Sequence, residues 1–236
     1  MERTLTQLVD RLKKTYDDRL VSVILYGSAA VGEHHRKFSD LNVLCVLREV
    51  TPRELADSTP IVRWWRDQGN PSPLMLGEEE IRRSTDCFPI EFQDIKERRR
   101  ILYGKDVVAD LRIGTVFYRA QVEHELRAKL LRLRQKAAGV MTDKNLLRSL
   151  LADSISTFCV LFRHALAIAG VDAKSGKREV VAQAAERFGI DAAPFNALLD
   201  LREEKIKPRE LDPGPVFGNY LKQIQSVIDA VDALEK

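Results

Sequence analysis

Apolar positions in the first part of the chain form short runs that polar and turn residues separate. Four of these runs have the length and composition of β-strands: residues 23–26, 43–47, 74–76 and 88–95. In the last run, FPIEFQDI, Glu91 and Gln93 would share one face of a strand. Helical segments precede and separate the runs. The pattern therefore predicts a small mixed β-sheet with helices on one side, spanning residues 1–110.

Strand patterns end after about residue 105, and a helical period replaces them. Five amphipathic segments follow, most of them joined by short loops. Two stripes carry many of their apolar side chains: Val122, Leu126, Leu130, Leu133 and Ala137, then Leu147, Leu151, Ile155, Phe158, Phe162 and Ala165. Arg163 and His164 belong to the second helix. They could form a polar pair that faces the other domain, but we expect them on the exposed face of the helix. The pattern predicts an antiparallel five-helix bundle at residues 115–236 and an α+β class for the whole chain.

Residues at the end of the first strand and the start of the second suit a phosphate and a metal ion. Gly27 and Ser28 end the first strand, where a glycine lets the backbone approach a ligand and exposed N–H groups suit phosphate. Asp40 and Asn42 begin the second strand, and strand alternation points both side chains to the same face. Adjacent oxygen ligands on one face of a rigid strand are what Mg2+-dependent phosphoryl transfer needs.

This arrangement resembles the nucleotidyltransferases of the DNA polymerase beta superfamily, including the kanamycin and related aminoglycoside nucleotidyltransferases. Their signature is Gly-Ser or Gly-Gly, a short spacer, Asp-x-Asp, and later a third acidic residue on another strand. Gly27, Ser28 and Asp40 match this signature. Asn42 stands where the second Asp normally does. The resemblance implies a nucleotidyltransferase fold for the first part of the chain.

The resemblance also implies roles for individual residues. Glu91 takes the place of the third carboxylate, with Asp94 as the second choice. Asp40 and Glu91 would then be the catalytic carboxylates. Asp40, Asn42 and Glu91 would bind Mg2+, with Asn42 offering one neutral carbonyl oxygen. The Gly-Ser turn would bind the β- and γ-phosphates of a nucleoside triphosphate such as ATP.

In the aminoglycoside nucleotidyltransferases a helical bundle supplies part of the acceptor pocket. By this resemblance, residues 115–236 are a candidate acceptor-binding domain. Bacterial two-domain proteins of the same type, whose acceptors are unknown, are a further resemblance. The implied acceptor carries a hydroxyl group and is a small molecule or a protein. Its identity, the preferred base and the oligomeric state stay open.

Two hypotheses of function follow. In the first, the chain is a Mg2+-dependent nucleotidyltransferase that moves a nucleoside monophosphate from an NTP to a hydroxyl-bearing acceptor. In the second, the neutral side chain of Asn42 leaves the site catalytically impaired, and the fold serves as a nucleotide-binding or protein-interaction module. A third alternative is an antitoxin-like protein that modifies another protein.

Charge bears on two questions, whether a nucleic acid binds and what the basic stretches do. The net charge of +3 gives no reason to expect a nucleic-acid partner, and we interpret the basic run at residues 96–100 as a solvated stretch. A second basic stretch lies in the loop between Ser28 and Asp40. It could meet a triphosphate or be a solvated loop: His34, His35, Arg36 and Lys37.

Cysteine usage and hydropathy indicate the cellular setting. Cys45, Cys87 and Cys159 lie far apart, which predicts free thiols in a reducing environment, two of them buried. The N-terminal residues show no signal-peptide core, and no apolar stretch is expected to reach membrane-spanning length. We therefore expect a cytoplasmic protein without a membrane partner.

Overall fold

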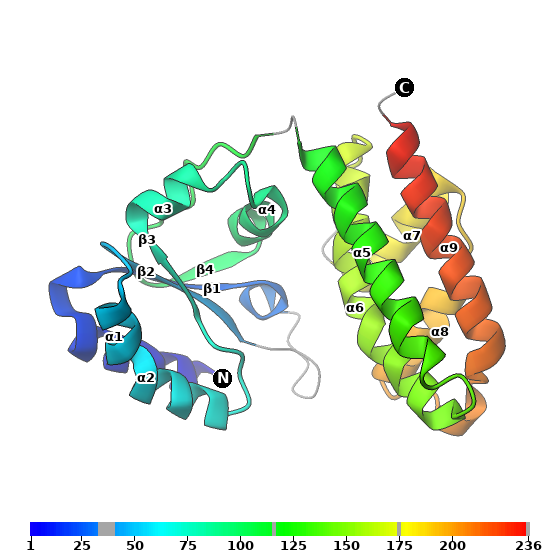
Figure 1. Ribbon diagram of the computed structural model, residues 1–236, viewed down its shortest axis with the longest axis horizontal. Helices are drawn as coiled ribbons and strands as arrows, with labels where there is room; N and C mark the ends of the chain where they lie inside the picture. The colour runs from blue at the N-terminus through cyan, green and yellow to red at the C-terminus, as the bar shows by residue number, and fades with distance from the viewer. Residues whose placement is uncertain (33–40, 115–116, 174–175, 235–236) are drawn as a thin grey trace. The chain divides into compact units, whose positions relative to one another are not determined.

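The computed structural model describes residues 1–32, 41–114, 117–173 and 176–234. The chain divides into two compact units, Met1–Gly114 and Thr115–Lys236 (Figure 1). The first contains a mixed sheet and the second is helical, which confirms the predicted α+β class.

The first unit is a four-stranded sheet between helices (Figure 1). Its elements in chain order are α1 (Glu2–Tyr16), η1 (Asp17–Arg19), β1 (Leu20–Tyr26), η2 (Ser28–Val31), β2 (Asn42–Leu47), α2 (Pro52–Asp67), β3 (Leu74–Gly77), α3 (Glu78–Arg83), α4 (Pro89–Glu97) and β4 (Arg99–Gly104). The strand order is β3-β2-β1-β4. β1 pairs antiparallel with β2 and β4, whereas β2 and β3 run parallel. The sheet is therefore mixed, as predicted.

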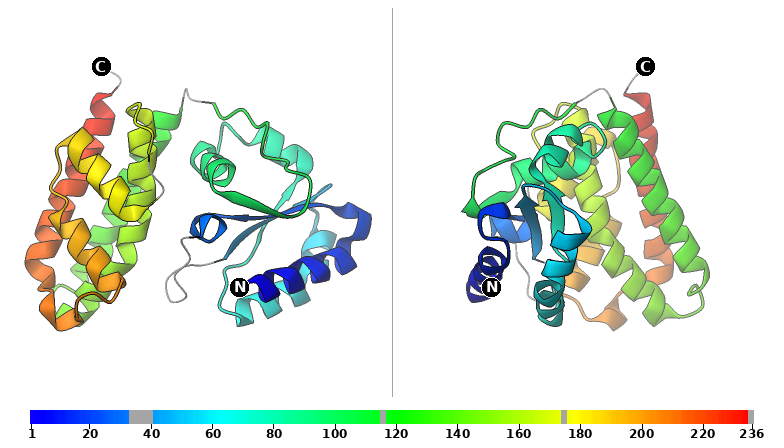
Figure 2. Two further views of the ribbon diagram at one scale, coloured as in Figure 1. Left: turned by 180° about the vertical axis from the view of Figure 1, so that it is seen from behind. Right: turned by 60° about the vertical axis from the view of Figure 1, so that its left-hand side comes forward.

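Helices cover both faces of this sheet, so the prediction of helices on one side is wrong. Leu8 of α1 and Trp65 of α2 belong to one hydrophobic core cluster, on one face of β1 and β2. Ile81 of α3 and Phe92 of α4 belong to a second cluster, on the other face. Figure 2 shows the two helix pairs on opposite sides of the strands. The two central strands are apolar on both faces, and each face needs a cover.

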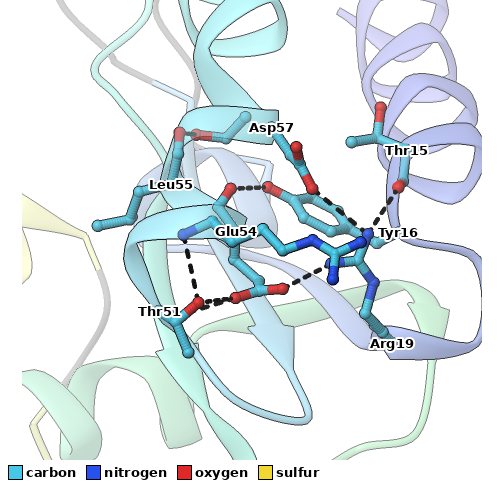
Figure 3. Close-up of polar contacts among 9 residues, drawn as sticks. Thr15, Tyr16, Arg19, Thr51, Glu54, Leu55 and Asp57 are labelled. Atoms are coloured by element: carbon cyan, nitrogen blue, oxygen red, sulfur yellow. Dashed lines mark hydrogen bonds and ion pairs between the residues drawn. The ribbon is translucent and has the colours of Figure 1, made fainter.

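A polar network joins α2 to the end of α1 (Figure 3). Arg19 donates a hydrogen bond to the Glu54 carboxylate at 2.5 Å. The Tyr16 hydroxyl donates to the Glu54 carbonyl oxygen at 2.6 Å. The Thr51 hydroxyl also donates to that carboxylate and caps α2, whose first turn holds Glu54. Because Glu54 is 4% exposed, these donors replace the water that its charge would otherwise require.

The second unit contains five α-helices within the described residues (Figure 1). They are α5 (Tyr118–Ala138), α6 (Lys144–Ile168), α7 (Lys177–Phe188), α8 (Ala193–Arg202) and α9 (Pro213–Ala233). Both predicted apolar stripes are buried. An aromatic cluster with ring centroids 5.1–6.5 Å apart lies in the core: Phe158, Phe162, Phe195 and Tyr220. The five-helix bundle is confirmed.

α6 is the central helix of this bundle and corrects two expectations. It packs against α5, α7, α8 and α9. By length and composition it could span a membrane, contrary to the expectation that no stretch would, and 56% of its most apolar window is buried inside the bundle. Arg163 and His164 are buried, not exposed, because neighbours surround this helix. The Nδ1 atom of His164 lies 2.5 Å from the Tyr118 hydroxyl.

The cysteines agree with the sequence prediction. Cys45 and Cys159 are buried free thiols, and Cys87 is an exposed free thiol. Burial raises the pKa of both buried thiols to about 12, which keeps them neutral and unreactive.

Candidate functional site

The glycine turn at the end of β1 forms as the sequence predicts. Gly27 has φ 78° and ψ −156°, a conformation that only glycine adopts without strain. Its N–H donates to the Arg98 carbonyl oxygen at 2.9 Å, and its own carbonyl accepts from Ala30 at 3.1 Å. The short 3-10 helix η2 begins at Ser28. The N–H groups of Ser28 and Ala29 therefore have no acceptor inside that helix and can serve a ligand.

Asn42 lies directly against this turn. The antiparallel register of β1 and β2 pairs Asn42 with Tyr26, the residue before Gly27. A Cβ atom on Gly27 would lie 3.4 Å from Nδ2 of Asn42. The half-buried Asn42 side chain thus borders the turn, and the absence of a side chain at position 27 leaves it room.

Strand alternation sets the face that Asn42 occupies. Leu41 and Val43 are buried in the cluster beneath α1 and α2, and Leu44 is buried in the cluster beneath α3 and α4. Asn42 alternates with Leu41 and Val43, so its side chain is on the α4 side of the sheet. Asp40 lies outside the described residues, as do His34, His35, Arg36 and Lys37. The role of Asp40 therefore remains a prediction from the sequence.

Glu91 is on a helix, so the predicted strand at 88–95 is wrong. α4 spans Pro89–Glu97, and Pro89 occupies its first turn, where proline favours a helix. Phe92 and Ile95, three residues apart, pack on the sheet, which is helical spacing. The run is too short for its apolar pattern to separate strand from helix. Asp94, the second choice for the third carboxylate, lies on the same helix.

Glu91 nevertheless lies on the same side of the sheet as the Asn42 side chain, because α4 packs on that face. Glu91 is exposed in the first turn of α4. Burial raises the pKa of the Tyr26 hydroxyl, and the charge of Glu91 raises it further, which places this carboxylate near the end of β1. The sequence analysis did not identify Tyr26 as a neighbour of the candidate site, although Tyr26 directly precedes Gly27 in the chain. Whether Glu91 is the third carboxylate stays a prediction.

The basic run at residues 96–100 is not a solvated stretch. The Lys96 ammonium donates to the Leu111 carbonyl oxygen at 2.7 Å. Arg99 forms a bidentate ion pair with Asp106, in which the shortest distance is 2.7 Å. These contacts hold the end of α4 and the start of β4 to the segment that follows β4.

Among the described residues, no three His, Cys, Asp or Glu side chains gather as a metal site. The described part of the predicted ligand set is the Asn42 amide and the Glu91 carboxylate. Both provide oxygen, which Mg2+ prefers, and Mg2+ commonly binds through one or two carboxylates and keeps several waters. The donor chemistry thus fits Mg2+.

Comparison with known proteins defines the class. The nucleotidyltransferase domain family matches residues 5–133, more than half of the chain. The chain therefore belongs to the nucleotidyltransferase domain family, and nucleotidyl transfer is the general activity that this membership supports. No curated protein sequence matches the chain.

A solved structure supports the same fold over both units. It is spectinomycin adenyltransferase AAD(9) from Enterococcus faecialis, in a crystal structure with ATP and spectinomycin. The similarity has a TM-score of 0.62 and covers 95% of this chain and 99% of that chain, at 13% sequence identity. Together with the family match, it confirms the resemblance to polymerase beta-like nucleotidyltransferases with a C-terminal helical part.

Proposed function

We propose that this protein transfers a nucleoside monophosphate from an NTP to a hydroxyl-bearing acceptor and requires Mg2+. The observation that carries the proposal is the Gly27 turn of a nucleotidyltransferase domain, with Asn42 packed against it. The N–H groups of Ser28 and Ala29, which have no acceptor inside η2, suit phosphate oxygens. Asp40 precedes Asn42 by two residues in the sequence and supplies the carboxylate that the family motif requires.

In this proposal Asp40 and Glu91 hold Mg2+, and Asn42 offers its amide oxygen as a third ligand. When bound, the ion would neutralise charge on the phosphates and on the oxygens that attack and leave. The Gly27–Ser28 turn would hold the β- and γ-phosphates. Glu91 is solvent-exposed, so its carboxylate is accessible to a ligand.

For the substrates, we propose ATP and a small hydroxylated acceptor. The support is the likeness over both units to a structure determined with ATP and spectinomycin. At 13% identity the acceptor pocket is free to differ, so the acceptor class is proposed only as hydroxyl-bearing.

A second candidate function is nucleotide binding without efficient turnover. The observation that favours it is Asn42, a neutral side chain where the family motif has a second aspartate. Fewer anionic ligands near a divalent ion weaken its binding, because Coulomb attraction at short range is lost. In that case the domain would sense or present a nucleotide rather than transfer it.

The test is pyrophosphate release from ATP and Mg2+ with a panel of hydroxylated acceptors that includes spectinomycin. We expect acceptor-dependent release that Asp40→Ala and Glu91→Gln abolish. Glu49→Gln is the matched control, because Glu49 is an exposed carboxylate on the connection after β2. This variant should keep the wild-type rate. Mg2+-dependent binding of ATP without release for any acceptor would favour the second candidate. Release that survives Asp40→Ala would contradict the proposed site.

A further inference from the structure

The helical bundle contains a groove between α5 and α6 with a volume of about 170 Å3. Lys129, Arg132 and Lys136 of α5 form one wall. Their spacing of three and four residues puts all three side chains on the same helix face. We call this hollow the α5–α6 groove.

The floor and the opposite wall of the groove differ in character from the cationic wall. Leu133 and Phe158 lie at the floor, and both side chains are buried. Ser154 and Thr157 of α6 add hydroxyl groups. The Ser154 hydroxyl already donates to the Leu151 carbonyl oxygen at 2.8 Å, so it is held in place by the helix. The groove therefore combines positive charge, hydroxyl groups and an apolar base.

The charges of the wall are balanced only in part within their own helix. Lys129 has Glu125 at 3.3 Å. Arg132 donates to the neutral Gln135 at 2.6 Å, and within the described residues neither Arg132 nor Lys136 has an ion-pair partner within 4 Å. Like charges three and four residues apart destabilise a helix, whereas solvated helix faces usually alternate in sign. The three like charges therefore lower the free energy of unfolding, and an anion bound in the groove would raise it again.

One carboxylate, Asp153, faces the three cations across the groove. Its charge also acts on Arg202 of α8, whose pKa burial lowers and Asp153 raises. Asp153 is thus shared between two sets of cations and does not neutralise the wall. The groove keeps a net positive potential.

We propose that the α5–α6 groove, which residues of the second unit alone line, binds a small phosphate-bearing molecule. A groove of this volume admits a phosphate and a short carbon body. Arg132, between the two lysines, presents the planar donor pair that binds phosphate oxygens in bidentate fashion. The carbon body would lie on Leu133 and Phe158, and its hydroxyl groups would meet Thr157.

The experiment is a methyl NMR titration of the full chain with glycerol 3-phosphate, in buffer without divalent ions. Glycerol is the uncharged probe, and inorganic phosphate is the probe without a carbon body. We expect glycerol 3-phosphate to shift the methyl signals of Leu133, Leu150 and Thr157, and to bind more tightly than phosphate. Glycerol should shift none of them.

Charge substitutions make the test specific. Arg132→Gln should weaken binding about fivefold, as expected for one exposed ion pair, while Asp153→Asn should tighten it. Arg134→Gln is the matched control, because this exposed arginine lies on the same helix and contacts Gln225 of α9, not the groove. Without ligand, Arg132→Gln should unfold at the wild-type temperature or above, since it relieves like-charge repulsion.

Several results would overturn the proposal. They are shifts confined to residues outside the groove, equal binding of phosphate and glycerol 3-phosphate, and equal weakening by Arg132→Gln and Arg134→Gln.

Discussion

At the scale of single residues, Gly27 and Asn42 set the shape of the proposed phosphate site. Gly27 occupies a backbone region that only glycine adopts freely. A Cβ atom at this position would lie 3.4 Å from Nδ2 of Asn42, so the missing side chain leaves space for the amide. A substitution at position 27 therefore adds backbone strain and places a Cβ atom in contact with the Asn42 amide.

We predict that Gly27→Ala lowers the free energy of unfolding by about 1–3 kcal/mol, the usual cost of a non-glycine residue in this backbone region. Gly32→Ala is the control, because Gly32 has φ 80° and no atom of the described residues lies within 4 Å of its Cβ position. Its cost should be smaller, since its αL conformation is tolerated better and no described atom would contact the new Cβ. Urea unfolding of both variants measures the difference, and equal or reversed costs would contradict the packing of Asn42 on the turn.

Glu54 gives a prediction about pH. Hydrogen bonds from Thr51 and Arg19 lower the pKa of Glu54 from 4.5 to about 2. A carboxyl group whose pKa falls on folding contributes stability above its ordinary pKa and loses it as the pH falls through the folded value. The contribution of Glu54 is therefore complete above about pH 4.5 and declines towards pH 2.

Urea unfolding at pH 7 and pH 3 tests this. Glu54→Gln should be less stable than wild type at pH 7, and its loss of stability between the two pH values should be smaller. Glu49→Gln, at an exposed carboxylate, should show the wild-type pH dependence. An unchanged pH dependence in Glu54→Gln would show that the network in Figure 3 does not stabilise the ionised carboxylate.

At the scale of secondary-structure elements, the start and end of β4 are fixed by its neighbours. Arg98, just before β4, accepts from Gly27, and Gly104 at its end lies against β1. Gly104 has φ 77°, and a Cβ atom there would lie 2.1 Å from the Val21 carbonyl oxygen. Backbone atoms cannot move aside as a flexible side chain can.

We predict that Gly104→Ala costs more than about 3 kcal/mol, because the clash adds to the strain of a positive φ. Gly139→Ala is the control, since its nearest contact is at 3.7 Å and its φ is negative. Thermal and urea unfolding should show near-wild-type stability for Gly139→Ala. Comparable stability of the two variants would contradict the close approach of β4 to β1.

The aromatic cluster inside the bundle gives a prediction for α6. Phe162 is fully buried between Phe158 and Phe195. Phe162→Ala should lower the free energy of unfolding by about 3–5 kcal/mol, through lost burial and the cavity that remains. Leu146→Ala, on the same helix but 54% exposed, should change it by less than about 1 kcal/mol. Urea unfolding measures both, and a small effect at Phe162 would place the core of the bundle elsewhere.

Elements with a clear period were predictable from the sequence, and short ones were not. The stripe from Val122 to Ala137 repeats over several turns, so its helix was unambiguous. The run around Glu91 is short: Ile90 and Phe92, two residues apart, fit strand alternation, whereas Phe92 and Ile95, three apart, fit a helix. Only its packing on the sheet, through Phe92 and Ile95, decides for the helix. The covering of both sheet faces was readable from the continuous apolar runs of β1 and β2.

At the scale of the candidate site, the sequence placed Gly27 and Asn42 together through a motif and strand alternation. It could not place Glu91, because the position of this carboxylate relative to the sheet depends on whether residues 88–95 form a strand or a helix. It also could not show that residues 96–100 are bound by Asp106 and Leu111, since those partners come from later in the chain. Tertiary contacts determine both the helical position of Glu91 and the partners of residues 96–100.

At the scale of the whole molecule, the chain joins a nucleotidyltransferase unit to a bundle with its own hydrophobic core. The change from strand patterns to helical stripes near residue 105 predicted this order. The similarity to spectinomycin adenyltransferase AAD(9) extends over both units, so the bundle is part of the shared fold and not an unrelated addition.

The central claim is that an NTP binds with Mg2+ at the Gly27 turn, and calorimetric titration with ATP tests it most directly. The titrations compare wild type, Asn42→Asp and Asp40→Ala, each with and without Mg2+. We predict Mg2+-dependent binding in wild type and none in Asp40→Ala. In Asn42→Asp, we predict binding about tenfold tighter (~1.4 kcal/mol), because an added carboxylate attracts the ion at short range. Tight ATP binding that is independent of Mg2+ and unchanged by both substitutions would contradict the claim.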